Sequence, residues 1–178
     1  VLRNNRAEYN VAGIEIENTV GADVYGNLAT NNTGGILVFN MPDLPVTGHS
    51  TRVYDNDITG NNTANFGAPG TAVASVPTGS GVVINSNDQV EIFGNRIGAN
   101  ETSNILISGL FSAEYTQTRE SAPDFDPYPE EIHIHGNTFS PGGEAPDREA
   151  LEGLRQALGG GRAVEAPSDH CDLAAAGT

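Results

Sequence analysis

The sequence predicts an all-β solenoid of about five coils, in which short strands from successive repeats stack on one another. Three observations indicate this fold. A motif of alternating apolar residues followed by Asn recurs along the chain, as in "ADVYGNLATNN" (22–32) and "VEIFGNRIGAN" (90–100). Glycine occurs 22 times and tryptophan is absent, which is typical of many turns and few long helices. A repeat this short cannot bury its apolar face alone, so neighbouring repeats must cover one another.

The Asn that ends each motif gives the length of the repeat. The five copies end, in chain order, at Asn4, Asn27, Asn56, Asn95 and Asn137. Their spacings are 23, 29, 39 and 42 residues, which we interpret as one bare unit followed by units that carry insertions. Asn tolerates left-handed backbone angles and bonds to neighbouring backbone, so each Asn marks a bend between sheets. Stacked copies are expected to hydrogen-bond along the axis as a ladder.

A second strand is predicted between these anchors, in "GIEIEN", "GILVFN", "GVVINS" and "NILISG". Each unit is therefore expected to contain two strands and two turns. Alternation along a strand assigns the inward positions. On the first strand they are Ala22, Val24, Thr51, Val53, Val90, Ile92, Ile132 and Ile134. On the second strand they are Ile14, Ile16, Ile36, Val38, Val82, Ile84, Ile105 and Ile107. Most are β-branched, which suits packing on a pleated surface.

Residues 1–143 form the predicted repeat region, and three insertions interrupt it. They cover residues 41–50, 63–81 and 110–131. Insertions in a solenoid often wall a binding face, although simple variation in loop length explains them equally well.

The remaining residues, 144–178, are predicted to contain one amphipathic helix near 147–158 and an irregular tail. Leucines 151, 154 and 158 recur at helical spacing, and three glycines follow them. The helix is expected either to cap the last coil or to cover the outward apolar row Leu37, Val83 and Leu106.

"VYGNLATNNTGGILVFN" and "VEIFGNRIGANETSNILISG" resemble the right-handed parallel β-helix repeat family, which includes pectin-lyase-like enzymes, alginate epimerases and many periplasmic or secreted bacterial proteins. The resemblance covers residues 1 to about 143. It implies a right-handed parallel β-helix and a periplasmic or extracellular location. Because this scaffold hosts several activities, it does not imply one reaction. The chain begins at Val1 inside a repeat, so we expect a fragment that lacks N-terminal coils.

Two outward columns on the first strand carry the candidate functional residues. The first column contains Asp23, Arg52, Glu91 and His133, and the second contains Leu2, Tyr25, Tyr54, Phe93 and His135. Vertical neighbours lie about 4.8 Å apart, so the alternating charges of the first column stabilise the register or else supply the catalytic groups of a lyase or epimerase. The rings of Tyr25, Tyr54, Phe93 and His135 either stack for stability or present apolar faces to a sugar.

The segment "EEIHIHGN" holds a candidate metal site. Glu131, His133 and His135 are predicted to point the same way along one strand, with Glu91 on the adjacent coil as a further ligand. Two imidazoles and two carboxylates suit a divalent ion such as Zn²⁺. The alternative is that these are ordinary surface histidines. Cys171 is the sole cysteine, which excludes a cysteine-based metal cluster within this chain.

The formal charge of −15 makes nucleic acid an unfavourable partner, because phosphate binding needs clustered Lys and Arg. No apolar run is long enough to insert into a membrane. We expect the chain to bind a polysaccharide or oligosaccharide along the outward face, with or without processing it. One alternative is a non-catalytic structural or accessory protein of a metalloprotein or surface system, whose partner is another protein. A second alternative is a polysaccharide lyase or epimerase. The sequence leaves open whether the chain is an enzyme.

Overall fold

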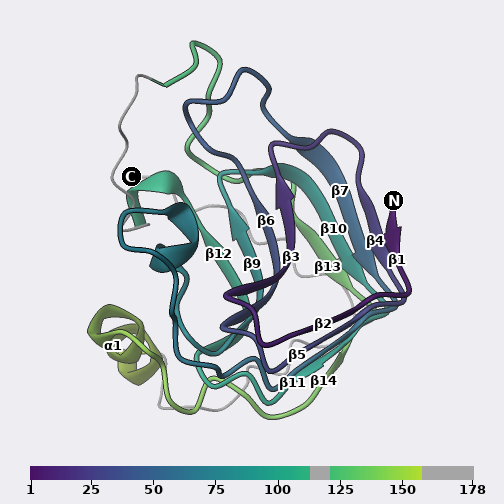
Figure 1. The fold of residues 1–178 in the computed structure, drawn as a ribbon, viewed down its shortest axis with the longest axis vertical. Helices are drawn as coiled ribbons and strands as arrows, with labels where there is room; N and C mark the ends of the chain where they lie inside the picture. The colour runs from purple at the N-terminus through teal and green to yellow at the C-terminus, as the bar shows by residue number, and fades with distance from the viewer. Residues whose placement is uncertain (113–120, 158–178) are drawn as a thin grey trace.

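The computed structural model describes residues 1–112 and 121–157. Its strands are parallel, and strands of successive coils lie side by side in three sheets. This arrangement is consistent with a parallel β-solenoid (Figure 1). The chain passes through sheets A, B and C in turn, and we call one passage a coil. Sheet A contains β1 (Leu2–Arg3), β4 (Asp23–Tyr25), β7 (His49–Tyr54), β10 (Asp88–Phe93) and β13 (His133–His135).

The other two sheets complete each coil. Sheet B contains β2 (Arg6–Glu8), β5 (Leu28–Thr30), β8 (Asp57–Thr59), β11 (Arg96–Gly98) and β14 (Thr138–Phe139). Sheet C contains β3 (Ala12–Glu17), β6 (Gly34–Phe39), β9 (Ser80–Asn85) and β12 (Ser103–Ser108). The expectation of two strands per unit is therefore wrong, because it treats the short strands of sheet B as turns. Each of these strands has two or three residues, too few to show a period of two.

The core lies inside the coils and is built as predicted from alternate residues of sheets A and C. The register pairs Val24 with Val53, Val53 with Ile92, and Ile92 with Ile134. All sixteen predicted inward residues except Thr51 belong to or pack against one apolar cluster, and Thr51 is buried at 0% exposure. Sheet B adds one inward residue per strand, among them Ala29, Ile58 and Ile97. The predicted faces are thus confirmed.

A ladder of Asn side chains runs along the corner between sheets A and B. Asn27 donates from its backbone N and from Nδ2 to Oδ1 of Asn56, over 3.0 and 2.9 Å. The same pair of bonds joins Asn56 to Asn95 and Asn95 to Asn137. In the first coil the donor to Asn27 is Asn5.

The assignment of Asn4 to this ladder is therefore wrong by one residue. The register places Arg3 beside Tyr25, so Asn4 stands at the level of Gly26 and Asn5 at the level of Asn27. Asn4 has a left-handed φ of 57°, like the residue that precedes each ladder Asn in the later coils: Gly26, Asp55, Gly94 and Gly136. The left-handed bend thus belongs to the residue before the ladder, where Gly or Asn is tolerated at little cost.

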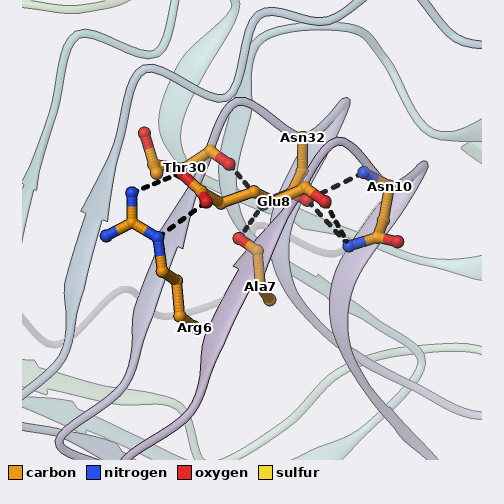
Figure 2. Close-up of polar contacts among 6 residues, drawn as sticks. All are labelled: Arg6, Ala7, Glu8, Asn10, Thr30 and Asn32. Carbon is orange, nitrogen blue, oxygen red and sulfur yellow. Dashed lines mark hydrogen bonds and ion pairs between the residues drawn. The ribbon is translucent and has the colours of Figure 1, made fainter.

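A second ladder, at the corner between sheets B and C, consists of Asn10, Asn32, Asn61 and Asn100. Asn32 donates through Nδ2 to Oδ1 of Asn61 over 3.0 Å, and Asn61 repeats this bond to Asn100 over 3.1 Å. Figure 2 shows its start, where Asn10 bonds to Asn32, and Asn32 also donates to the carbonyl oxygens of Ala7 and Thr30. This ladder was not among the predicted features, although its Asn follows the first by five residues in the first four coils; in the fifth coil Gly142 stands at that position.

The short helices lie outside the coils. Insertion 63–81 forms η1 (Ala72–Ser75), insertion 110–131 begins with η2 (Leu110–Ser112), and α1 spans Glu149–Ala157. The helix therefore lies within the predicted range 147–158, whose last residue is outside the described part. Val76, which follows η1, packs against Leu37 and Val83, so the insertion covers much of the apolar row that α1 was expected to cover. Within the described ranges, no helix has the length and apolar character needed to cross a membrane.

Candidate metal site on sheet A

The outward face of sheet A carries two columns of side chains, as alternation predicts. One column runs through Asp23, Arg52, Glu91 and His133 in register. The other runs through Tyr25, Tyr54, Phe93 and His135. At the head of this second column the register places Arg3 beside Tyr25 and pairs Leu2 with the buried Val24. The expected place of Leu2 in the aromatic column is therefore wrong, for the same one-residue reason as Asn4.

The aromatic column is a continuous stack of rings. Ring centroids lie 4.8 Å apart from Tyr25 to Tyr54, 4.9 Å from Tyr54 to Phe93 and 5.2 Å from Phe93 to His135. The planes differ by 11°, 7° and 2°, so both faces of Tyr54 and of Phe93 are covered by neighbouring rings. Loss of hydration inside the stack raises the pKa of Tyr54. The column presents ring edges to solvent, and a sugar stacked on the flat face of a central ring would have to separate the stack.

The charged column divides into two separate contacts. The Arg52 guanidinium bonds to Oδ1 of Asp23 at 2.8 Å. Glu91 turns away from this pair, and its Oε1 lies 3.0 Å from Nε2 of His135 and 4.0 Å from Nδ1 of His133. The four proposed catalytic side chains are therefore neighbours in the sheet, but their polar contacts join them two by two.

Glu91, His133 and His135 form a triad of metal-binding type. The donor atoms of all three lie within 4.8 Å of one another. The two imidazole rings have centroids 4.4 Å apart. A tetrahedral Zn²⁺ with bonds of about 2.0–2.2 Å holds its ligand atoms roughly 3.5 Å apart. The Glu91–His135 pair is already that close, and the widest pair needs to approach by about 1 Å, which a side-chain rotation can supply.

Sheet geometry brings these three donors together. Glu91 and His133 are direct neighbours across β10 and β13, and His135 follows His133 by two residues on the same face. The ring of His135 is held parallel to Phe93, which restricts its orientation. Both histidines are exposed and Glu91 is half-buried, so the triad opens to solvent.

Glu131 does not join the triad. It has a left-handed φ of 54° in the turn before β13, and Ser50 and Gln89, the second residues of β7 and β10, are left-handed as well. The prediction that Glu131 lies on one strand with His133 and His135 is wrong, because strand alternation does not continue through this turn. Left-handed residues recur where the chain enters sheet A, and they mark a corner. The alternation of inward and outward residues along the sequence cannot detect this corner.

Insertion 110–131, in its described part, follows the corner between sheets C and A. Ala122 donates to the carbonyl of Pro42, and Ser86 Oγ donates to the carbonyl of Pro127. Figure 1 shows the loops before β7 and β13 gathered at one edge of the sheets. The Phe111 and Tyr128 rings, both exposed, lie 6.1 Å from each other. The described residues of this insertion thus make their contacts at the edge of sheet A and with one another.

Comparison with protein-family models, with curated proteins and with solved structures finds no match to this chain.

Proposed function

We propose that this chain is a right-handed parallel β-helix that binds a divalent transition-metal ion such as Zn²⁺ through Glu91, His133 and His135. The observation that carries the proposal is the convergence of three donor atoms within 4.8 Å on one exposed face. Two imidazole nitrogens and one carboxylate oxygen are a preferred ligand set for Zn²⁺. The handedness and the family rest on the resemblance of the repeats to known β-helix proteins, which three stacked parallel sheets support.

Three protein ligands leave one tetrahedral position for a solvent molecule or a ligand. This is the pattern of zinc sites that act on or hold a further molecule, whereas purely structural sites use four protein ligands. Both imidazoles bind the ion in their neutral form.

Calorimetric titration of Zn²⁺ into the metal-free chain tests the proposal. We expect saturable binding in the unaltered chain and its loss in the His133→Ala, His135→Ala double variant. His49→Ala is the matched control, because His49 is also exposed on sheet A but lies in β7, away from the triad. Circular dichroism establishes that each variant is folded. Equal heats from all three proteins would show that Zn²⁺ binds elsewhere and would contradict the proposal.

Saccharide binding along sheet A is the second candidate function. It is favoured by one observation: the hydroxyl-bearing edges of Tyr25 and Tyr54 adjoin the Asp23–Arg52 pair on an open face. In this form of the proposal an oligosaccharide bonds to hydroxyl and charged groups rather than stacking on a ring face. With this function we propose a periplasmic or extracellular location.

The pair of variants Tyr54→Phe and Tyr54→Ala separates the two roles of the tyrosine. Tyr54→Phe keeps the ring stack and removes the hydroxyl, so it should lower oligosaccharide affinity with an unchanged melting temperature. Tyr54→Ala opens the stack and should lower the melting temperature. If no polysaccharide in a panel binds the unaltered chain or Tyr54→Phe, the ring stack has a structural role and the saccharide proposal is contradicted.

A further inference from the structure

The imidazole of His135 is held by two neighbours, Phe93 and Glu91. Its ring plane lies 2° from that of Phe93, with the centroids 5.2 Å apart. A fixed plane still allows two orientations, related by a half turn about the Cβ–Cγ bond. The contact of Nε2 with Oε1 of Glu91, at 3.0 Å, is made in one of them. The stack therefore sets the plane of the imidazole, and Glu91 sets which edge carries the donor nitrogen toward the triad.

His133 is held less closely than His135. Its neighbour in register is Glu91, which offers no ring to stack on. The ring of His133 is tilted by 32° to that of His135, and its Nδ1 lies 4.0 Å from Oε1 of Glu91, beyond hydrogen-bond distance. Its side chain is 60% exposed, against 44% for His135. Of the two imidazoles, His135 is thus the one placed in advance, and His133 is the one with room to move toward an ion.

Phe93 is itself fixed from behind. The ring of Tyr54 covers its other face at 4.9 Å and 7°. The residue before it, Ile92, is buried at 0% exposure and is paired in register with both Val53 and Ile134. The spacing of the rings follows from the spacing of strands in a sheet, about 4.8 Å, so the stack needs no distortion of the backbone. His135 therefore leans on a platform that is anchored in the core.

We propose that Phe93 is a positioning residue for the metal site and sets its affinity for Zn²⁺ by holding the ring of His135. This inference rests on the proposed function, because the ion has to bind at the triad. An imidazole that is free on a surface strand samples several orientations, and binding of an ion then has to order it. A ring that is already ordered removes part of this cost. Neighbours that orient a metal-binding histidine typically change metal affinity by about 10- to 100-fold.

Calorimetric titration of Zn²⁺ into three variants tests the role of Phe93. Phe93→Leu keeps an apolar side chain without a flat ring and should weaken Zn²⁺ binding by about tenfold. Phe93→Tyr keeps the ring, as Tyr54 does in the adjacent strand, and should retain the affinity of the unaltered chain. Phe39→Leu is the matched control, because Phe39 is also half-buried but lies in β6 of sheet C. It should leave Zn²⁺ affinity unchanged.

Thermal unfolding of the metal-free variants separates positioning from stability. Phe93→Leu and Phe39→Leu should both lower the melting temperature, whereas Phe93→Leu alone should lower Zn²⁺ affinity. Phe93→Met is a second probe without a ring, for use if Phe93→Leu is unfolded. If the unaltered chain bound Zn²⁺ and the variants without a ring bound it equally tightly, the positioning role would be overturned and the proposed function would stand. Equal weakening by Phe39→Leu would also overturn it, since the loss would then follow stability. If the unaltered chain bound no Zn²⁺, the proposed function itself would fail.

Discussion

At the scale of single residues, the Asn side chains decide where the chain turns. A ladder Asn uses all its hydrogen-bonding capacity: Asn56 accepts from Asn27 through Oδ1 and donates through Nδ2 to Asn95 and to the carbonyl of Val24. It is only 3% exposed, so no water can replace these bonds. The residue before it supplies the left-handed bend. One position therefore needs an amide, and the preceding one needs backbone freedom.

Replacing Asn56 with Ala should cost about 3 kcal/mol of unfolding free energy, because it leaves the buried N–H of Asn27 and carbonyl of Val24 without their partner. Denaturant unfolding measures the loss. Asn4→Gly is the contrasting variant: it keeps a residue suited to the φ of 57° and should leave stability nearly unchanged. If Asn4→Gly were as harmful as Asn56→Ala, Asn4 rather than Asn5 would carry the ladder.

Glu15 predicts a dependence of stability on pH. Its pKa is raised above the ordinary 4.5 by loss of hydration and by Glu17, so the folded chain holds this proton more tightly than the unfolded chain does. Its ionisation therefore lowers stability as pH rises from about 4.5 through the raised pKa. Glu15→Gln should raise the melting temperature at neutral pH, and this gain should shrink near pH 4. The control is Glu144→Gln, an exposed glutamate outside the strands. An equal gain in melting temperature at both pH values would show that the ionisation of Glu15 is not its cause.

At the scale of elements, the strands of sheets A and C were predictable from sequence and those of sheet B were not. Six-residue strands such as β7 and β9 show two or three inward residues, so their period of two is visible. A strand of sheet B shows one, such as Ile58 in β8, and has the composition of a turn. The candidate metal site was likewise predictable in part. Register predicts that Glu91 and His133 meet, but the left-handed turn at Glu131 depends on the corner and has no periodic signal.

Glycines at the start of the sheet C strands allow the Asn side chains of the second ladder to lie close to the backbone of these strands. A Cβ added to Gly35 would lie 2.6 Å from the carbonyl oxygen of Gly81 and 2.9 Å from Nδ2 of Asn61. Gly35→Ala should therefore cost about 3 kcal/mol through overpacking. Gly153→Ala in α1 is the control, since it meets no atom within 4 Å and improves helix propensity. Thermal unfolding compares the two, and equal melting temperatures would show that the ladder can shift to admit a methyl group.

At the scale of the whole molecule, stability is expected to vary from coil to coil. Each central coil is covered on both sides, whereas the fifth coil contacts only the fourth among the described strands. Its strands β13 and β14 have two or three residues with mostly exposed side chains. Open segments of this kind exchange their amide hydrogens by local opening rather than by global unfolding. The fifth coil, like the first, should therefore open before the central coils.

The proposed metal site joins that coil to its neighbour, since Glu91 belongs to the fourth coil and both histidines belong to the fifth. An ion bound only when the coils are docked must oppose their separation. At a free Zn²⁺ concentration about 100 times the dissociation constant, opening should cost about 2.7 kcal/mol more, and exchange should slow by about 100-fold. Hydrogen exchange should show this slowing in β13 and β14 and no change in β4 and β5. The His133→Ala, His135→Ala variant should show none of it. If Zn²⁺ slowed amide exchange equally in every coil, it would stabilise the whole molecule rather than this junction. If Zn²⁺ slowed exchange in the double variant as well, the ion would bind elsewhere on this acidic chain.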